Sequence, residues 1–243
     1  ECEEAVSLRA RGELGTVMWQ TVPAAPTTGA LLPESVARPE VCAREKVCIQ
    51  FIGGDRGGAT RPQLMLPREE KEIRDAVNLG AFRDRFAFSD TVHAASVEDV
   101  IACHRFNPGI VHFAGHGEER RLILVQDRDL LAQQRVLSAE QLVTLFRNYP
   151  KRVGLVFLNV CHSADLARGL ASAGVVDMAI GVPGQLADDL AIFFARTFYR
   201  QLSDGLSVRQ AFEMAGLQHA AGAARHELFA ANGIVPEALT FRS

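Results

Sequence analysis

Short apolar runs alternate with amphipathic segments along the chain from residue 46 onward. The run V-G-L-V-F-L-N-V (153–160) has the length and β-branched content of a buried strand. The segment P-R-E-E-K-E-I-R-D-A-V-N-L (67–79) begins with proline and acids and keeps its apolar residues on one side, as a helix does. Predicted strands cover residues 46–52, 85–92, 109–114, 153–160 and 175–182. Predicted helices cover residues 67–79, 96–106, 138–149, 163–170, 187–202 and 208–220.

This alternation of strands and helices predicts parallel crossovers, because a parallel pair of strands needs a long connection between them. The expected fold class is α/β, a three-layer sandwich with a mostly parallel central sheet flanked by helices. Ser96 and Ser138 stand at two predicted helix starts, with acids or glutamine close behind them, which is typical of N-caps. In such sheets the functional residues lie at the carboxyl ends of the strands.

The first 45 residues lack this pattern. Residues 21–33 are rich in Pro, Thr and Ala, so residues 1–45 are predicted to form a linker or N-terminal arm with a short helix at 2–11, a remnant of an upstream domain. Trp19, the single tryptophan, suggests that the arm docks on another surface, of which the domain at 46–243 is one candidate. Because the chain starts at Glu1 rather than at Met, we expect a trimmed or processed product or a part of a longer protein.

Charge and cysteine content narrow the classes of partner and cofactor. With 26 Lys and Arg against 29 Asp and Glu, the net charge of −3 favours neither a nucleic-acid nor a membrane partner. No apolar run reaches the roughly 20 residues that cross a bilayer, and no signal segment opens the chain, so a reducing cytoplasm is the expected setting. The cysteines are odd in number and form no C-x-x-C pair, so we expect no disulfide framework, metal or other cofactor. They are Cys2, Cys42, Cys48, Cys103 and Cys161.

Two predicted strands end in residues that carry chemistry. H-F-A-G-H-G closes one strand at His116, and L-N-V-C-H-S closes the next at Cys161. If both strands are central and parallel, the two side chains face each other at one edge of the sheet. A thiol with a pKa of about 8.5 is mostly protonated at neutral pH, and a neighbouring imidazole accepts its proton and later protonates a leaving amine. These residues predict a His–Cys catalytic dyad.

The glycines beside His116 fit this chemistry. Gly115 and Gly117 allow a sharp turn without a Cβ clash. The exposed N–H of Gly117, together with the N–H of Cys161, would form an oxyanion hole for a tetrahedral intermediate. The helix predicted at 163–170 follows Cys161 and would favour its thiolate through the helix dipole.

These motifs resemble those of CHAT-domain peptidases, which belong to the caspase, separase and gingipain group. The resemblance covers residues 46–220, including the tail A-I-G-V-P-G-Q-L-A-D-D-L-A-I-F-F-A-R-T-F-Y-R. His116 and Cys161 are 45 residues apart, close to the roughly 50 of caspases, although the Q-A-C-x-G signature of true caspases is absent. The resemblance implies a caspase-like fold and a cysteine endopeptidase with catalytic His116 and Cys161 and an oxyanion hole at Gly117 and Cys161.

The resemblance also implies a substrate groove shaped by the loop after the fifth strand. In Arg-cleaving relatives an acid in that loop pairs with the substrate, and the matching position here is Gln185, followed by Asp188 and Asp189. The neutral Gln185 speaks against selection of arginine, and the two acids are expected instead to cap the helix that begins there. Family likeness further suggests a regulated effector that cleaves a protein partner in a bacterial antiviral or conflict system, joined to a sensor or repeat domain or a regulatory partner.

Several residues allow a second interpretation. His112 is expected to be buried and hydrogen-bonded, but a zinc site of His112, His116 and Cys161 or His162 is the alternative. His162 is a candidate for lining the substrate groove. Asn159 either orients His116 or a loop, or is a satisfied buried amide.

Two other functions compete with the peptidase. One is a catalytically silent, caspase-like interaction scaffold. The other is a small-molecule-binding α/β domain that uses the glycine-rich run G-G-D-R-G-G (53–58) after the first strand.

Overall fold

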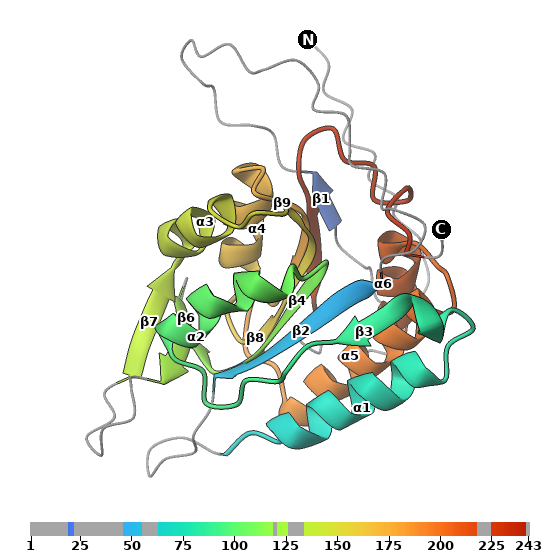
Figure 1. The fold of residues 1–243 in the computed structure, drawn as a ribbon, viewed down its shortest axis with the longest axis horizontal. Coiled ribbons are helices and arrows are strands. Elements are labelled where there is room, and N and C mark those ends of the chain that lie inside the picture. Colours follow the sequence, from blue (N-terminus) through green and yellow to red (C-terminus); the bar gives the residue numbers. More distant parts are fainter. Residues whose placement is uncertain are drawn as a thin grey trace.

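The computed structural model describes residues 19–21, 46–54, 63–118, 121–125, 134–217 and 225–241. Within these residues, seven strands form one sheet in the order β1-β10-β9-β8-β4-β2-β3 (Figure 1). Neighbouring strands are parallel except β10, which runs antiparallel to β9. The strands are β1 (Trp19–Thr21), β2 (Val47–Gly54), β3 (Phe86–Phe88), β4 (Ile110–Gly115), β8 (Val153–Val160), β9 (Val176–Gly181) and β10 (Glu227–Ala230).

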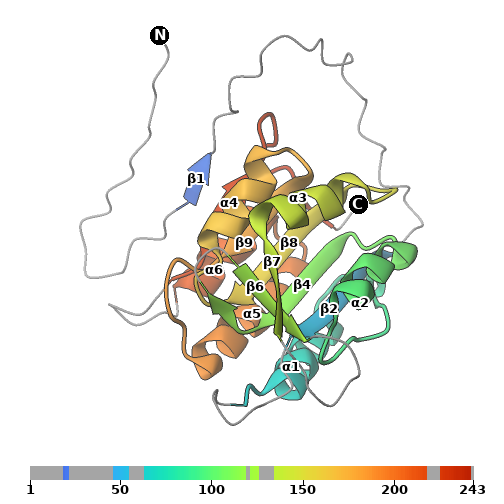
Figure 2. The same ribbon diagram turned by 90° about the vertical axis from the view of Figure 1, so that its left-hand side faces the viewer.

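Helices cover both faces of this sheet. One face carries α1 (Leu66–Asn78), α5 (Asp188–Ser203) and α6 (Val208–Gly216). The other carries α2 (Val97–Ala102), α3 (Ala139–Arg147) and α4 (Ala164–Ser172). Figure 2 shows α3 and α4 on the side of the sheet opposite α1 and α5. The predicted three-layer α/β architecture is confirmed.

Two apolar clusters fill the spaces between the layers, because side chains alternate between the two faces of a strand. On β8, Leu155 and Phe157 pack toward α5 and α6. Val156 and Leu158 pack toward α3 and α4. Since both faces of the central strands are buried, their sequences are mostly apolar, which is the pattern of a parallel strand in an α/β fold.

A small second sheet follows the end of β4. It consists of β5 (Gly117–Glu118), β6 (Arg121–Val125) and β7 (Gln134–Ser138), all antiparallel. Leu122 and Leu124 of β6 are buried in the apolar cluster on the α3 and α4 side. The sheet therefore rests on the domain directly beside the residues that follow β4.

Some predicted elements are shorter than expected, and five strands were not predicted: β1, β10 and the three strands of the small sheet. The strand expected at 85–92 is reduced to β3, with the 3₁₀ turn Arg83–Arg85 before it and a single bridge from Val92 to Ile52 after it. The helix expected at 96–106 is α-helical only to Ala102 and continues as a 3₁₀ turn, Cys103–Phe106. Neither β1 nor β10 was predicted as a strand.

Part of the N-terminal arm joins the sheet. Trp19–Thr21 pairs in parallel with Leu228–Ala230 of β10, so the expectation that the arm docks on another surface is confirmed for these three residues, and that surface is the domain. The helix expected at 2–11 lies outside the described residues. No described helix is both long and apolar enough to cross a bilayer.

Candidate active site

The register of β4 and β8 determines where the two predicted dyad residues lie. The two strands are parallel neighbours, and their last two pairs are Ala114 with Asn159 and Gly115 with Val160. The next residue on β4 is His116, and the next on β8 is Cys161. Both residues are partly buried. The structure thus brings His116 and Cys161 to adjacent carboxyl ends of the sheet.

Gly117 lies against the backbone of Cys161. A Cβ atom at Gly117 would be 2.2 Å from the carbonyl oxygen of Cys161 and 2.4 Å from Cγ1 of Val160. The φ angle of Gly117 is not positive, so the glycine is required by this close approach, as the expected Cβ clash predicts, and not by a left-handed backbone. The carbonyl of His116 also accepts a hydrogen bond of 3.2 Å from the N–H of Ile123 in β6. These contacts hold the histidine loop against the cysteine.

The thiol of Cys161 contacts the loop between β9 and α5. The N–H of Leu186 donates to Cys161 Sγ at 3.3 Å, and Sγ lies 3.7 Å from the carbonyl oxygen of Leu186. Sequence reasoning missed Leu186 because its contribution comes from the backbone, which leaves no signal in the residue type.

The turn after Cys161 is fixed by backbone and hydroxyl hydrogen bonds. His162 has a positive φ of 56°, and its N–H donates to the carbonyl of Gly184 at 3.0 Å. The buried hydroxyl of Ser163 donates to the carbonyl of Val160 at 2.6 Å and accepts from the N–H of Val182 at 3.0 Å. The cysteine turn and the loop after β9 are therefore joined, while a groove-lining role for His162 stays a prediction.

His112 is fully buried and faces the α1 and α5 layer. Its Nε2 is 2.8 Å from Oε1 of Glu69, and its Nδ1 is 3.2 Å from the hydroxyl of Tyr199. Both ring nitrogens thus have partners other than His116 or Cys161. The described residues contain no group of three or more His, Cys, Asp or Glu side chains arranged to hold a metal ion. Burial with hydrogen bonding is the interpretation of His112 that the structure supports.

Asn159 is a satisfied buried amide. Its Nδ2 donates to Oε1 of Glu69 at 2.6 Å, and its Oδ1 lies 2.9 Å from Nε2 of His226. These two hydrogen bonds engage both the nitrogen and the oxygen of the Asn159 amide, on the α1 side of β8. The first of the two expectations, that Asn159 orients His116 directly, has no hydrogen bond to support it.

The three predicted specificity residues follow β9. Gln185 is exposed, in the same loop as Leu186. Asp188 Oδ2 accepts from the N–H of Met65 at 2.9 Å, and burial raises the pKa of this carboxyl. Asp189 Oδ1 lies 2.8 Å from Nη1 of Arg68. The N-cap of α5 is Ala187 without a side-chain hydrogen bond, so the prediction that either acid caps α5 is wrong: both acids join α5 to α1 instead. Substrate contacts by Gln185, Asp188 and Asp189 stay a prediction.

The described part of the glycine-rich run is explained by packing. A Cβ at Gly53 would lie 2.9 Å from Cδ1 of Leu66, and a Cβ at Gly54 would lie 2.6 Å from the carbonyl of Ile123. Residues 55–58 lie outside the described residues. Packing therefore explains two glycines of the motif on which the small-molecule interpretation depends.

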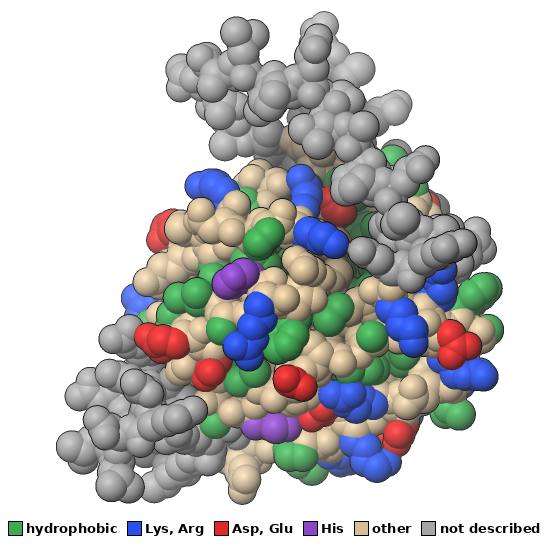
Figure 3. All heavy atoms as spheres, in the orientation of Figure 1, with side chains coloured by type: hydrophobic (Ala, Val, Ile, Leu, Met, Phe, Trp, Pro, Cys, Tyr) green, Lys and Arg blue, Asp and Glu red, His purple; other side chains and the backbone are tan. Residues whose placement is uncertain are grey.

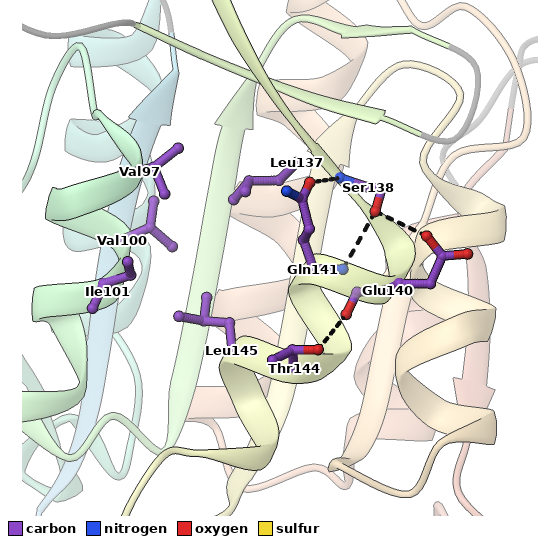
Figure 4. Close-up of a pocket in the computed structure, with 9 residues that line it drawn as sticks. All are labelled: Val97, Val100, Ile101, Leu137, Ser138, Glu140, Gln141, Thr144 and Leu145. Atoms are coloured by element: carbon purple, nitrogen blue, oxygen red, sulfur yellow. Dashed lines mark hydrogen bonds between the residues drawn. The ribbon is translucent and has the colours of Figure 1, made fainter.

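A separate cavity of about 360 Å³ lies between α2 and α3 (Figure 4). Most of its polar lining groups are already bonded within α3. Ser138 and Gln141 form a capping box, and the hydroxyl of Thr144 donates to the carbonyl of Glu140 (Figure 4). The cavity is lined by Val97, Val100, Ile101, Leu137, Ser138, Glu140, Gln141, Thr144 and Leu145. Since neither His116 nor Cys161 is among these residues, the cavity is distinct from the candidate active site.

The surface charge agrees with the small net charge of the sequence. On the face drawn in Figure 3, basic and acidic side chains are interspersed rather than gathered into patches of one sign. Opposite charges also pair four residues apart along the chain, as Lys71 does with Asp75 and Arg200 with Asp204.

Comparison with known proteins identifies both the family and the fold. Residues 51–232 match the CHAT domain, whereas no curated protein matches the sequence. Caspase-1 from Spodoptera frugiperda has a TM-score of 0.53 and 10% identity, covering 81% of this chain and 89% of that chain. The Drosophila initiator caspase Dronc has a TM-score of 0.50 and 9% identity. The match covers 94% of this chain and 96% of that chain. These two likenesses confirm the caspase-like fold.

A third solved structure is a secreted C11 cysteine protease from Bacteroides thetaiotaomicron in complex with an irreversible peptide inhibitor. Its TM-score is 0.46 and its identity 9%, covering 70% of this chain and 58% of that chain. This chain therefore spans less than two thirds of the length of that protease. The family match supports the enzyme class expected from the sequence, a cysteine protease. Because the match extends over more than half of the chain, the chain belongs to the CHAT-domain family.

Proposed function

We propose that this chain is a cysteine endopeptidase with Cys161 as nucleophile and His116 as general base and acid. The observation that carries the proposal is the register of β4 and β8, in which Gly115 pairs with Val160. The residues that follow these two are a thiol and an imidazole at neighbouring strand ends. Thiol and imidazole at one sheet edge are the pair of groups that nucleophilic acyl transfer requires.

The reaction proceeds in two steps. In acylation, His116 takes the proton of the Cys161 thiol, the sulfur attacks the scissile carbonyl carbon, and the resulting imidazolium protonates the leaving amine as the C–N bond breaks. In deacylation, His116 takes a proton from water, whose oxygen attacks the thioester. The C–S bond then breaks, and the imidazolium returns its proton to the sulfur. No cofactor takes part in either step.

An oxyanion hole at the N–H groups of Gly117 and Cys161 would stabilise the tetrahedral intermediates of both steps. The close approach of Gly117 to the Cys161 carbonyl supports this assignment, since it brings the two amides into one small region. Preorganised N–H donors of this kind each contribute about a hundredfold or more to the rate. The Leu186 N–H, 3.3 Å from Sγ, would assist by stabilising the thiolate before attack.

The substrate is proposed to be a protein partner whose cleaved residue is not arginine. Both carboxylates near the loop after β9 are already bonded to α1, Asp188 to Met65 and Asp189 to Arg68. The remaining candidate, Gln185, is neutral. A peptide library should therefore reveal no selection for a basic residue at the cleavage site.

The biological setting is part of the same proposal and rests on family likeness. It is a regulated effector in the cytoplasm, in a bacterial antiviral or conflict system, acting with an upstream sensor or repeat domain or a regulatory partner. Cys48, Cys103 and Cys161 are all free thiols, which suits a reducing compartment.

Cleavage of a proteome-derived peptide library tests the proposal. Wild type should cleave, whereas Cys161→Ala and His116→Ala should each lose about a thousandfold or more in kcat/KM. Cys48→Ala is the matched control, because it removes another partly buried thiol from a strand of the same sheet and should retain full activity. Activity that survives in Cys161→Ala would refute the dyad. A wild type that binds a native partner without cleaving it would instead indicate the interaction scaffold.

A further inference from the structure

Five polar side chains form a buried hydrogen-bonded network beneath the dyad. At its centre is Glu69 of α1, only 2% exposed, whose Oε1 is 2.8 Å from Nε2 of His112 and 2.6 Å from Nδ2 of Asn159. Tyr199 of α5 bonds the other ring nitrogen of His112, and His226 bonds the oxygen of Asn159. The network thus joins residues of α1, β4, β8 and α5 with the residue before β10.

These hydrogen bonds converge on one oxygen of the Glu69 side chain. A carboxylate oxygen only accepts, so the ring nitrogen of His112 and the amide nitrogen of Asn159 both donate to it. The amide oxygen of Asn159 then accepts from His226, and the other nitrogen of a neutral His112 ring accepts from the Tyr199 hydroxyl. Burial raises the pKa of Tyr199 well above its usual value, which keeps that hydroxyl a donor. All the donors of the network therefore point toward one carboxylate.

An acidic group in this position is unexpected if packing alone is considered. His112 is stacked between Phe51 and Phe157, with ring centroids 5.2 Å and 4.8 Å away. Replacing buried ionic groups by apolar side chains of similar volume is often neutral or stabilising. A buried acid bonded to a histidine that is stacked between two aromatic rings therefore points to a requirement for defined geometry rather than for stability.

The network lies directly below the residues that react. Asn159 is two residues before Cys161 on β8, and His112 is four residues before His116 on β4. One carboxylate oxygen thus bonds both strands that carry the dyad. On β8 it does so at Asn159, opposite Ala114 in the second-to-last pair of the register, and on β4 at His112, opposite Phe157 two pairs earlier.

The same turn of α1 also bonds the element that follows the Leu186 loop. The N–H of Met65 donates to Asp188, and Arg68 pairs with Asp189, at the start of α5. Figure 1 shows α1 and α5 side by side on one face of the sheet. Leu186, two residues before Asp188, contacts the sulfur of Cys161. The first turn of α1 is therefore connected to both dyad strands and to the loop that contacts the nucleophile.

We propose that Glu69 is a positioning residue of this peptidase: its buried carboxylate fixes the β4 and β8 strand ends relative to each other, and with them His116 relative to Cys161. The inference rests on the proposed function and deepens it. Glu69 does not touch substrate and acts only through His112 and Asn159. Small misplacements of reacting groups lower rates strongly, so loss of the carboxylate should reduce the coupling between imidazole and thiol.

The test measures the alkylation rate of Cys161 by iodoacetamide as a function of pH, with labelling of the Cys161 peptide followed by mass spectrometry. This readout needs no substrate and reports the thiolate directly. In Glu69→Gln, a near-isosteric change, we expect the rate at pH 6 to fall about tenfold, and kcat/KM to fall about tenfold to a hundredfold, mostly in kcat. A purely structural role would lower the melting temperature without moving the pH profile.

Glu70→Gln is the matched control. Glu70 is the next residue of α1 and is also hydrogen-bonded, but to Arg74, Thr91 and His93 rather than to β4 or β8. It should lose stability yet keep the wild-type pH profile. Asn159→Leu is a second variant: it removes the β8 contact of Glu69 and leaves its contact with His112, so it should lower the reactivity of Cys161 in the same direction.

The outcomes separate the two proposals. If His116→Ala leaves the pH profile of Cys161 unchanged, the proposed function fails. If His116→Ala shifts that profile but folded Glu69→Gln does not, or if Glu70→Gln shifts it equally, the positioning role of Glu69 is overturned. Should Glu69→Gln fail to fold, Asn159→Leu decides: a shifted pH profile supports the proposal, and a wild-type profile refutes it.

Discussion

At the scale of single residues, the close packing of Gly117 against the Cys161 backbone determines how near the histidine loop lies to the cysteine. A Cβ at Gly117 would overlap the Cys161 carbonyl at 2.2 Å, and backbone cannot move aside as a flexible side chain can. We expect Gly117→Ala to push the histidine loop away from the cysteine, lowering kcat/KM by about a hundredfold and stability by about 1–3 kcal/mol. Steady-state kinetics and urea unfolding measure the two effects.

Gly169→Ala is the control for this substitution. Gly169 lies inside α4, where a Cβ would make an ordinary contact of 3.6 Å with Ala139. Alanine in a helix interior is favoured over glycine by about 0.5–1 kcal/mol, so this variant should be slightly more stable than wild type and fully active. Equal activity losses in the two variants would show that any added methyl group disturbs the enzyme.

The cysteines differ in their surroundings, which leads to a second prediction. Burial raises the pKa of the Cys103 thiol to about 12, and burial also raises the pKa of Cys48. Only about a thousandth of Cys103 would be thiolate at pH 9, so its alkylation should remain slow from pH 6 to pH 9 while Cys161 reacts readily. Mass spectrometry of the native protein measures this difference, and labelling in urea should remove it. Rapid native labelling of Cys103 would contradict the burial.

At the scale of helices and strands, side-chain caps set several boundaries. Ser96 accepts a hydrogen bond from the N–H of Asp99, whose side chain bonds back to Ser96. Ser96→Ala removes this cap of α2 and should lower the free energy of unfolding by about 1 kcal/mol, measured by urea unfolding. Ser172→Ala is the comparison, because the Ser172 hydroxyl only bonds back to the carbonyl of Arg168 and should change stability by less than about 0.5 kcal/mol. An unchanged Ser96→Ala variant would count against the cap.

Elements with strong local signals were predictable from the sequence. The strand at 153–160 has the predicted bounds, because its apolar run is long and bounded by polar residues. The capping boxes at Ser96 and Ser138 follow from short-range chemistry. By contrast, β10 is a four-residue run, E-L-F-A, and forms a strand through pairing with β9, which lies far away in the sequence. Pairing of this kind leaves no local pattern to detect.

The same distinction applies to the candidate site. His116 and Cys161 were predictable because each ends a strong strand and the fold class brings parallel strand ends together. Glu69 was not, because an acid in the first turn of a helix has an ordinary explanation in the helix dipole. Its partners His112 and Asn159 are 43 and 90 residues away in the sequence. Only the packing of α1 on the sheet reveals that this acid is buried rather than exposed.

At the scale of the whole molecule, the sheet ends in two strands of different kinds. The edge strand β3 belongs to the region matched by the family, whereas β1 comes from residues before that region. β1 covers the outer edge of β10 through three paired residues. Covered edges protect sheets from pairing with other chains. Removal of residues 1–45 should therefore leave a cooperatively folded domain with an open β10 edge and a greater tendency to self-associate, measurable by sedimentation.

Trp19 makes this arrangement measurable in the intact chain. It is the only tryptophan, so fluorescence excited at the indole band reports on the β1 edge, while far-ultraviolet circular dichroism reports on all the helices and strands. A three-residue pairing makes few hydrogen bonds, and small edge units open at lower free energy than the core. We expect the fluorescence transition in urea to precede the circular dichroism transition, and Trp19→Phe to remove the first without moving the second. Coincident transitions would mean that β1 is an integral part of the cooperative domain, because release of the edge would then require unfolding of the whole sheet.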